Sequence, residues 1–408
     1  MTRIEDAILR AAATRVLRRN DRGRVVVAAE PDPRRHHRWH WEATLTALGL
    51  ARVDLPRAIT EVRALLAAQR PTGMLPLSIF DEGRATGPGP VQAVGLSSLP
   101  GQPIAVRAIL DRGRDNGGAD LAAAEEFVAE SFDALLASHR WFVTERDPER
   151  TGLIEILHPW ESAFPASPRW DGPLSRSGPH PRATREERER WLLEQMRAVG
   201  WADTAMREVA DFRVRDVIVS AVVATCADLL AGLADEVGRT DVTEELKEDA
   251  ARFREGVAAT VDPRTMLARD FDVRAGVWIE PATVAGFAPL LAGGDAELLA
   301  AQRAILLGED WMGHPVLRHP LPPMVSPSSP GFRRRELWHG PIWPPVVVML
   351  AWAATRDGAW DLRAVLRDAM LELLSDHSFA EFYEPITGEP LGVHDHSWTA
   401  ATALELLG

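Results

Sequence analysis

Two kinds of helical pattern alternate along this chain, and they restrict its fold more than any other feature. The segments 217–233 and 342–354 are apolar nearly all round, whereas 244–258 and 361–374 place apolar residues at three- and four-residue spacing with charges between them. A helix that is apolar on every side must be buried on every side, while an amphipathic helix keeps one face in water. An inner ring of buried helices inside an outer ring of amphipathic helices satisfies both requirements.

The same periodicity predicts helices along almost the whole chain, at 3–19, 41–50, 55–69, 104–112, 119–144, 183–198, 213–237, 241–259, 281–291, 295–307, 342–355, 361–375 and 397–407. No βαβ series or run of hairpins is visible between them, so the fold class is all-α and the architecture an α/α barrel. A stack of helical repeats would look similar, but the sequence has no fixed period. No linker divides the chain, so residues 1–408 are predicted to form a single domain.

Charge and composition exclude several classes of protein. The 408 residues carry 46 Lys+Arg against 59 Asp+Glu, a formal net charge of −13, which argues against nucleic acid or an anionic membrane as partner. The N-terminal residues lack the hydrophobic region of a signal peptide, and no apolar run approaches the roughly 20 residues of a membrane span. Cys226 is the single cysteine, so an internal disulfide is excluded and a cytoplasmic location is expected.

Standard motifs for cofactors and metals are missing as well. The sequence has no G-x-G-x-x-G, no G-x-x-x-x-G-K-[ST], no H-E-x-x-H and no G-x-S-x-G. The histidines near positions 40 and 394–396 lack the spaced carboxylates that would complete a metal site, so ordinary hydrogen bonding is favoured. We therefore expect no metal and no cofactor. The partner is expected to be a small-molecule substrate, and the sequence leaves the oligomeric state open.

Five segments stand out by their density of tryptophan, proline, glycine and polar residues. They are 39–51, beginning WHWE; 69–76, QRPTGMLP; 158–171, HPWESAFPASPRWD; 338–345, WHGPIWPP; and 379–388, FAEFYEPITG, which is followed by SWTAA at 397–401. Half of the 14 tryptophans lie in them, which favours a pocket lined by aromatic rings over an exposed patch on the outer helices.

Together these segments resemble the mannosylglycerate and glucosylglycerate hydrolases of glycoside hydrolase family 63, within the wider trehalase-like group. The resemblance covers essentially the whole chain, in the same order. It implies an (α/α)6 barrel and an inverting α-glycosidase mechanism, in which one carboxylic acid protonates the leaving oxygen and one carboxylate activates water. The family pattern F-x-E-Y-x-x-P-x-T-G places that base on Glu381.

The position of the general acid departs from the family pattern. The family reads H-P-W-E-S-G-x-D-N-S-P-x-W-D, and its first aspartate is the acid. Here Pro165 occupies that position and Ala166 replaces the neighbouring asparagine. Proline has no proton to give, so the leaving group cannot be protonated from this position.

Other family positions change in the same direction. Leu77 and Val347 replace a histidine and an asparagine that would bind sugar, and His339 replaces an arginine. A sugar is bound through many hydroxyl hydrogen bonds, so losing their partners costs orders of magnitude in affinity or rate. The tryptophans and Glu381 remain, which favours a retooled, more apolar cavity over simple decay.

Our first hypothesis is a repurposed enzyme that uses Glu381 for acid–base chemistry, such as cyclisation, isomerisation or elimination, on a less polar small molecule. Burial among aromatic rings would raise the pKa of a glutamate toward neutrality. The expected catalytic residues are Glu381, His396 and Glu161, with His339 and Glu42 as further candidates for a second proton-transfer group. The expected substrate-binding residues are Trp39, Trp41, Glu42, Gln69, Trp160, Trp170, Trp338, His339, Trp343, Tyr383 and Trp398.

Two alternatives remain open. The protein could be an inverting α-glycosidase whose acid has moved, with Glu161 or Asp171 approaching the leaving oxygen while Glu381 stays the base. It could also be a binding protein without catalytic activity on the same scaffold. Tryptophans confined to the five segments favour a pocket, and hence either of the enzyme hypotheses.

Overall fold

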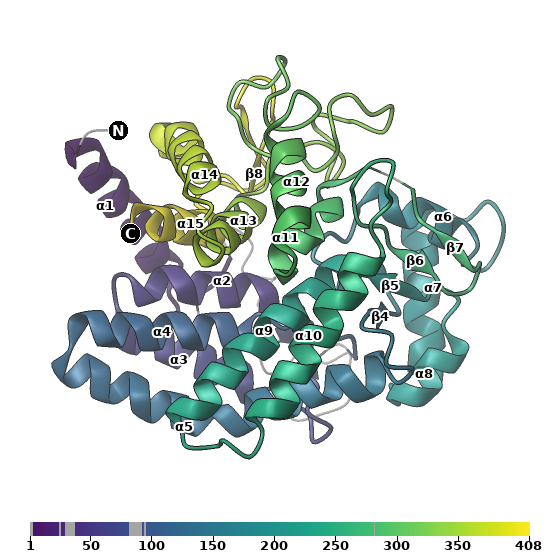
Figure 1. The fold of residues 1–408 in the computed structure, drawn as a ribbon, viewed down its shortest axis with the longest axis horizontal. Helices are drawn as coiled ribbons and strands as arrows, with labels where there is room; N and C mark the ends of the chain where they lie inside the picture. Colours follow the sequence, from purple (N-terminus) through teal and green to yellow (C-terminus); the bar gives the residue numbers. More distant parts are fainter. Residues whose placement is uncertain (1–2, 24–25, 29–36, 81–91, 94, 281) are drawn as a thin grey trace.

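A closed ring of inner helices forms the centre of the molecule (Figure 1). In the computed structural model, residues 3–23, 26–28, 37–80, 92–93, 95–280 and 282–408 are described, and six helices of this part form the ring. Each packs against the next and the last returns to the first, in the order α2 (His40–Ala51), α4 (Gln102–Asn116), α9 (Val217–Glu236), α11 (Ala288–Ala292), α13 (Pro344–Arg356) and α15 (Ser397–Leu407).

A second set of helices covers this ring from outside. In the described part of the chain these are α1 (Arg3–Asn20), α3 (Leu55–Leu66), α5 (Gly118–Trp141), α10 (Thr243–Ala259), α12 (Ala296–Leu307) and α14 (Trp360–Leu373). Outer and inner helices alternate along the sequence, and each outer helix packs on one or more inner helices. The predicted all-α fold and its (α/α)6 barrel are therefore confirmed.

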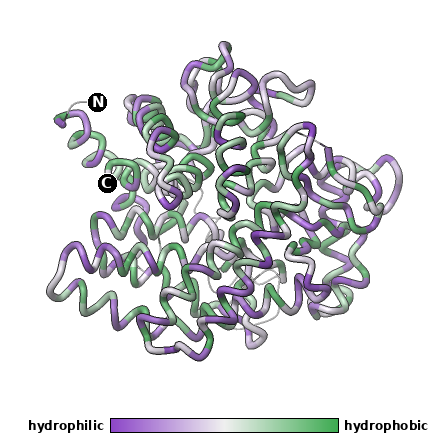
Figure 2. The backbone as a smooth tube through the Cα atoms, viewed as in Figure 1, coloured by the Kyte–Doolittle hydropathy of each residue, from purple (hydrophilic) through white to green (hydrophobic). Residues whose placement is uncertain are grey.

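The apolar pattern decides which helices are inside. Helix α9 is buried over most of its length, from Val217 to Ala234, and Figure 2 shows its tube mostly green, whereas the tube of α5 changes repeatedly between purple and green. Helix α9 is also long and apolar enough to cross a membrane, but 83% of its apolar window is buried inside the protein. Its composition is that of a core helix surrounded by other helices.

Short polar residues define where several helices begin. The side chains of Asp54, Asp216 and Asp295 accept hydrogen bonds from main-chain N–H groups in the first turns of α3, α9 and α12. These caps satisfy donors that a helix leaves unpaired at its N-terminus. Because Asp216 is itself buried, its cap also fixes the point at which the chain enters the inner ring.

An excursion of the chain between α5 and α9 leaves the barrel, and apart from the helix predicted at 183–198, which is confirmed, the periodicity did not reveal its structure. After a π-helical turn (Phe142–Arg146), the described chain contains the short helices α6 (Asp171–Ser175), α7 (Arg185–Ala198) and α8 (Asp203–Val209), on the right of Figure 1. Beside them lies an antiparallel sheet in the order β4 (Ile154–Ile156), β5 (Val214–Asp216), β6 (Phe271–Asp272) and β7 (Val277–Trp278), in which Ile154 pairs with Asp216. Strands of two or three residues are too short for an alternating pattern to be recognised.

Two further small sheets lie next to inner-ring helices. One has the order β1 (His37–Trp39), β2 (Ser78–Phe80) and β3 (Gln92–Ala93), and the other joins β8 (Phe382–Tyr383) to β9 (Pro390–Leu391). Single-turn 3-10 helices occur at Pro159–Glu161, Pro168–Trp170, Val284–Phe287 and Leu374–Asp376.

The structure differs from the predicted helices at two places, and one predicted loop lies partly outside the described residues. The helix predicted at 281–291 is a 3-10 turn followed by the five-residue α11, since Pro289 and Gly293 confine the α-helical part. Helices α6 and α8 were not predicted, because they are only one or two turns long. The sequence also predicts a loop rich in proline and glycine at 83–103, of which residues 83–91 and 94 lie outside the described residues.

Closure of the ring depends on a close approach of α2 and α15. A side chain added at Gly49 would place its Cβ 2.5 Å from the Cα of Ala401, and a main-chain atom cannot move aside. We expect Gly49→Leu to lower the free energy of unfolding by about 2 kcal/mol or more through overpacking. The measurement is chemical denaturation. Gly232→Ala in α9 is the matched control, because nothing lies within 4 Å of the position that its Cβ would occupy, and it should leave stability unchanged or raise it.

Candidate active site

Four inner helices begin close together, and the conspicuous segments meet there. The ring of Trp41, on the first turn of α2, lies against Gly101 at the start of α4, where an added Cβ would come within 2.9 Å of it. Trp343, just before α13, meets Trp398, on the first turn of α15, edge to face with 5.7 Å between ring centroids. Trp41 and Trp398 both belong to helices, within the segments predicted as helical at 41–50 and 397–407.

Glu381 is held by the main chain of Val393 and by the side chain of Trp398. Its N–H donates to the carbonyl of Val393 at 2.8 Å, its carboxylate accepts from the N–H of Val393 at 3.2 Å, and its own carbonyl accepts from Trp398 Nε1 at 3.1 Å. Gly392 has a φ of +74°, and a Cβ there would come within 2.5 Å of the Glu381 carboxylate. The carboxylate therefore lies directly on the main chain of residues 392–393.

Glu42 is the second carboxyl group at this end of the barrel. It lies half-buried on the first turn of α2. Burial, with a further contribution from the negative charge of Glu381, raises the pKa of Glu42 to about 8. At neutral pH Glu42 therefore carries a proton, and it is close enough to Glu381 to sense its charge. A protonated and an ionised carboxyl group with separate pKa values are the usual acid and base of proton-transfer enzymes.

Stacked aromatic rings form one wall beside Glu381. Trp338 stacks on Trp343 with 3.6 Å between centroids and 9° between planes, and Trp343 stacks on Phe382 at 4.7 Å. Phe164 packs against Trp338 at 5.3 Å. The segment that carries Pro165 is thus attached to the segment that precedes α13, and through Phe382 to the strand next to Glu381.

Trp39 and Trp160 form a second aromatic contact. Their rings meet edge to face at 6.4 Å, and both are half-buried. Trp160 Nε1 donates to Glu189 of α7 at 3.2 Å, so the excursion fixes the orientation of this ring. Partly exposed tryptophans with fixed orientation are suited to stacking against a ligand.

Five of the expected substrate-binding residues are buried, including Trp338 and Trp398, and the other three are almost completely so. Trp170 and Tyr383 have exposed fractions of 0% and Trp343 of 1%. Trp170 Nε1 donates to the carbonyl of Phe164, while the Tyr383 hydroxyl accepts from the N–H of Ala380 at 2.8 Å. In this conformation they position the segments around Glu381 and cannot touch a ligand. The sequence could not reveal this, since a buried and a ligand-facing ring follow the same motif.

The contacts of Glu161 favour a structural role over the catalytic role that was predicted. Its side chain is buried and accepts from both terminal nitrogens of Arg146, at 3.0 and 2.7 Å, and from the N–H groups of Ser97 and Leu157. Burial alone would raise its pKa, but the charge of Arg146 and these hydrogen bonds outweigh that effect and hold the pKa below its usual value. An ionised carboxylate with all its acceptor sites used is a structural group, not a proton donor.

His396 also cannot serve as a general acid at neutral pH. It is buried, and burial lowers the pKa of its imidazole to about 3. The ring lies 4.3 Å from that of Trp398, so it belongs to the aromatic wall. His339 is half-buried, and its Nδ1 lies 2.8 Å from the carbonyl of Leu337. The neutral imidazole of His396 keeps one N–H, so it can donate one hydrogen bond and accept another.

Two other predicted residues have partners elsewhere. The amide of Gln69 donates to the carbonyls of Gly73 and Ala134, which ties the 70–73 turn to α5. Asp171 is exposed and pairs with Arg185 at 3.2 Å. Neither contact connects these residues to Glu381, so a direct role for Gln69 in binding stays a prediction.

The apolar replacements fall into two groups. Pro165 and Ala166 are half-buried, and the carbonyl of Pro165 lies 3.4 Å from Arg185 Nη2. Leu77 and Val347 have exposed fractions of 6% and 0%, so they pack in the core and do not face a ligand. The expectation that all four line a dry cavity is therefore wrong for Leu77 and Val347, which weakens the argument for an apolar substrate.

One buried ion-pair cluster was missed altogether. Arg169 Nη1 lies 2.9 and 2.8 Å from the two carboxylate oxygens of Asp270 and 3.5 Å from Asp216, while its guanidinium group covers the ring of Trp170 at 4.1 Å. Asp270 also accepts from the N–H of Val217 at 3.0 Å. The cluster attaches the 164–170 segment to the start of α9. Because Arg169 and Asp270 are 101 residues apart, no local pattern could have found it.

Within the described ranges, no group of three or more His, Cys, Asp or Glu side chains converges as a metal ion requires. The site offers one carboxyl group that can give a proton, Glu42, and a second carboxyl group, Glu381, at the same end of the barrel beside aromatic surfaces. An acid–base glycosidase needs two such groups.

Comparison with known proteins agrees with this class. A family model described as the mannosylglycerate hydrolase MGH1-like glycoside hydrolase domain matches residues 35–399. The chain is 38% identical to a glucosylglycerate hydrolase of Mycolicibacterium hassiacum over 98% of both chains, and 34% identical to a mannosylglycerate hydrolase of Thermus thermophilus over 96% of this chain and 99% of the other.

Solved structures lead to the same family. A GH63 mannosylglycerate hydrolase from Thermus thermophilus in complex with glucose superposes with a TM-score of 0.87 at 34% identity, covering 97% of this chain and 99% of that one. Neutral trehalase Nth1 from Saccharomyces cerevisiae, at 14% identity and a TM-score of 0.56, shares the fold, with 93% of this chain and 72% of that one covered. The chain belongs to the MGH1-like glycoside hydrolase family, as the resemblance implied.

The structural role of Glu161 can be tested through stability. Glu161→Gln would leave the buried guanidinium of Arg146 without its counter-charge, so we expect a loss of about 3–5 kcal/mol in the free energy of unfolding. Denaturant titration measures it. Glu130→Gln removes an exposed pair with Arg63, and should cost about 1 kcal/mol or less. Equal effects of the two variants would contradict the structural role.

The raised pKa of Glu42 predicts a pH-dependent stability. A carboxyl group whose pKa is raised to about 8 on folding, from 4.5, stabilises the protein below pH 4.5 and loses that contribution as pH rises to 8. Glu42→Gln carries no ionisable proton. Its melting temperature should therefore increase relative to the original protein as the pH rises from about 5 to about 9. A difference that does not change with pH would show that Glu42 titrates normally.

Proposed function

We propose that this protein is an inverting glycoside hydrolase acting on a small-molecule glycoside, with Glu381 as the general base and Glu42 as the displaced general acid. One observation carries the proposal: two carboxyl groups share one end of the barrel, and Glu42 holds its proton at neutral pH beside Glu381. An inverting enzyme needs such a pair, one group able to give a proton and the other able to take one.

Other described carboxyl groups in or near the five tryptophan-rich segments form ion pairs or hydrogen bonds with the protein. Glu161 is bound to Arg146, and Asp171 is exposed and paired with Arg185. Glu384 is buried and accepts from the N–H groups of Ile386 and Thr387, which shapes the turn between β8 and β9. Glu189 is held by Trp160 and Arg185. Glu42 is therefore favoured for the role that Pro165 cannot fill, because its pKa is raised to about 8.

In this mechanism Glu381 removes a proton from a water molecule, whose oxygen attacks the anomeric carbon while the bond to the leaving oxygen breaks. Glu42 gives its proton to that leaving oxygen, so both products are neutral at the cleaved bond. Exchange with solvent then restores the two protonation states. The main-chain contacts of Glu381 keep its carboxylate in a fixed orientation, which reduces the cost of reaching the transition state.

The class of substrate is supported by the relatives. The proteins of Mycolicibacterium hassiacum and Thermus thermophilus are named for glucosylglycerate and mannosylglycerate, and a Thermus structure holds glucose. The half-buried Trp39 and Trp160 offer faces and edges against which a sugar ring can pack. We therefore place glycerate glycosides first among candidate substrates.

A second function is favoured by the residues that differ from the family pattern near Glu381. Pro165 and Ala166 replace a polar acid–amide pair at half-buried positions, and His396 adds a neutral imidazole. The same pair of carboxyl groups could then serve a cyclisation, isomerisation or elimination on a less polar small molecule. Both functions share Glu381 and Glu42, so they differ in substrate and not in the residues that move protons.

We also propose that residues 1–408 form one domain and that the protein is cytoplasmic. The domain proposal is supported by the packing of α15 on both α1 and α2, which joins the two ends of the chain. The location rests on the single cysteine, Cys226, which lies buried in α9.

Substitution of the two carboxyl groups tests the mechanism. We expect Glu381→Gln and Glu42→Gln each to lower kcat by at least about 10²-fold while the fold is retained, because proton transfer by one group contributes that much. In the original protein, kcat/KM should fall as pH rises through about 8, where Glu42 ionises. Hydrolysis of glucosylglycerate and mannosylglycerate provides the assay, with Glu130→Gln as an unaffected control.

Retained activity in Glu42→Gln with loss in Glu381→Gln would remove Glu42 from the mechanism and leave the base in place. Activity in both variants would remove the acid–base proposal altogether.

A ligand panel separates the alternative substrates. A ligand at a hundred times its dissociation constant stabilises a protein by about 2.7 kcal/mol, which a melting shift detects. Stabilisation by glycerate glycosides supports the glycosidase, and stabilisation by terpenoid-like compounds alone supports the second function. Tight binding of either class, with no turnover by the original protein, would instead support the binding protein considered from the sequence.

A further inference from the structure

The other end of the barrel contains a cleft that the proposed function does not use. It has a volume of about 370 Å³ and lies where α2, α4, α13 and α15 end, whereas the candidate active site lies where these helices begin. Its polar lining is rich in arginine: Arg52, Arg107, Arg112, Arg356 and Arg363, with Asp111, Asp115 and Glu405.

Not all of these guanidinium groups are matched by carboxylates. Arg52 forms a two-point ion pair with Glu405 at 2.8 and 3.0 Å, and Arg107 pairs with Asp111 at 2.7 Å. Arg356 pairs with Asp357, beside the cleft, at 2.7 Å. The described contacts of Arg363 consist of one hydrogen bond, to the hydroxyl of Thr355 at 2.9 Å.

Arg112 has unused hydrogen-bonding capacity. Its Nε is buried and has no partner among the described residues, and its ion pair with the exposed Asp115 is long, at 3.5 Å. Burial lowers the pKa of Arg112, and the neighbouring charge of Arg52 lowers it further. A buried donor without an acceptor costs free energy, which a bound anion would recover.

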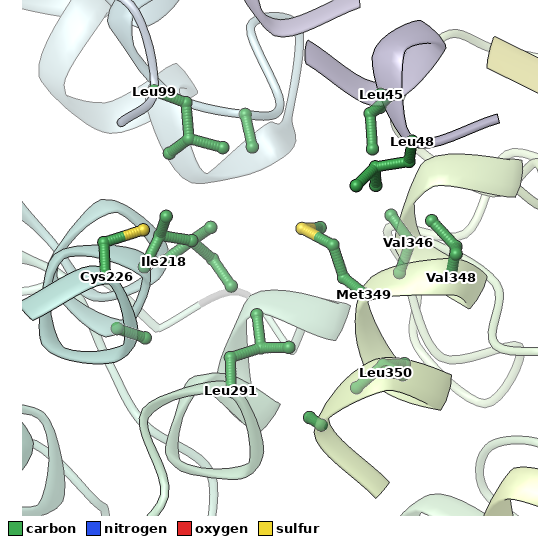
Figure 3. Packing of buried hydrophobic residues seen from close by; sticks show 14 of the residues in the cluster. Leu45, Leu48, Leu99, Ile218, Cys226, Leu291, Val346, Val348, Met349 and Leu350 are labelled. Atoms are coloured by element: carbon green, nitrogen blue, oxygen red, sulfur yellow. The ribbon is translucent and has the colours of Figure 1, made fainter. Parts of the chain in front are cut away.

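An apolar hollow continues from this cleft into the barrel. Ile104, Ala108, Val348 and Trp352 line both spaces, so the two adjoin. Deeper in the hollow, whose volume is about 60 Å³, the lining is formed by inner-ring side chains that include Leu45, Leu48, Val222, Leu291 and Met349. Figure 3 shows Leu45, Met349 and Leu291 approaching a common centre from α2, α13 and α11.

The arginine-lined cleft and the adjoining apolar hollow together select one kind of ligand. Helix C-terminal ends carry partial negative charge and repel anions, so arginines with spare donors are needed for an anion to bind here. The adjoining hollow is narrow and almost without polar atoms, and it would take a slender hydrocarbon group. A ligand that satisfies both parts has an anionic head and an apolar tail.

We propose that this end of the barrel is a second ligand site, which binds an organic anion with its carboxylate or phosphate head on Arg112 and Arg363 and its apolar tail in the hollow bounded by Ile104, Ala108 and Trp352. The hollow is also lined by Trp41 and Gly101, so it extends toward the end of the barrel that carries Glu42. The proposed anion contacts with Arg112 and Arg363 lie at the opposite end, and the proposal does not depend on the acid–base chemistry.

Calorimetry with four probes tests the proposal: octanoate, octyl phosphate, octanol and inorganic phosphate. We expect at least one of the two amphiphilic anions to bind with a Kd below about 1 mM, and the binding to weaken as salt is added. Its preferred head group identifies the natural ligand class. Octanol and inorganic phosphate, which carry only the tail or only the charge, should bind at least about tenfold more weakly.

Variants locate the bound probe. Arg112→Gln and Arg363→Gln should each weaken binding about tenfold, by loss of a charged hydrogen bond, and Ala108→Phe should abolish it by closing the passage into the hollow. Arg190→Gln, in an exposed pair with Glu186 on α7, is the matched control and should bind normally. Unchanged binding in Glu381→Gln shows that the probe does not occupy the active site. Melting curves identify any variant that fails to fold.

Four results would overturn the proposal. These are no heat from either anion at millimolar concentration, octanol binding as tightly as octanoate, inorganic phosphate binding as tightly as octyl phosphate, and normal binding in both arginine variants.

Discussion

The packing of α15 against α2 is the contact on which the rest of this structure depends. It brings the last helix of the chain onto the first inner helix, and it requires a glycine, because Gly49 and Ala401 leave no room for another side chain. Ring closure also brings the segment before α15, which carries Glu381, to the first turn of α2, which carries Glu42. The candidate active site therefore exists only when the two ends of the chain have met.

Buried ion pairs hold the 158–171 segment in place although its acid position, Pro165, differs from the family pattern. Arg146 with Glu161, and Arg169 with Asp270, fasten the 158–171 segment to the barrel from both of its ends. Breaking such a pair is costly, because it leaves a buried charge without a partner. Pro165 lies between these anchors, on a half-buried turn, and its side chain carries no structural hydrogen bond. This explains how the acid can be absent while the scaffold, the tryptophans and Glu381 are retained.

The two carboxyl groups and the arginine-lined cleft show how one barrel can hold two chemical environments. At the end where the inner helices begin, burial and mutual repulsion keep Glu42 protonated beside Glu381. At the end where they finish, Arg112 and Arg363 retain donors that the described part of the protein does not use. Each environment follows from the helix ends and the charges placed there, and an apolar hollow lined by Trp41 and Trp352 lies between them.

The sequence by itself determined the helices, the barrel, the family, the expected position of the base at Glu381 and the loss of the acid at Pro165, because these depend on periodicity and on residue types within short segments. Tertiary structure alone decided the protonation states and the exposure of side chains. Glu42 differs from Glu161 because Arg146 reaches only the latter, and Tyr383 and Trp170 lie beneath the surface although their motifs suggest ligand contact. Desolvation, ion pairing and burial arise from residues distant in the chain, and no local pattern contains them.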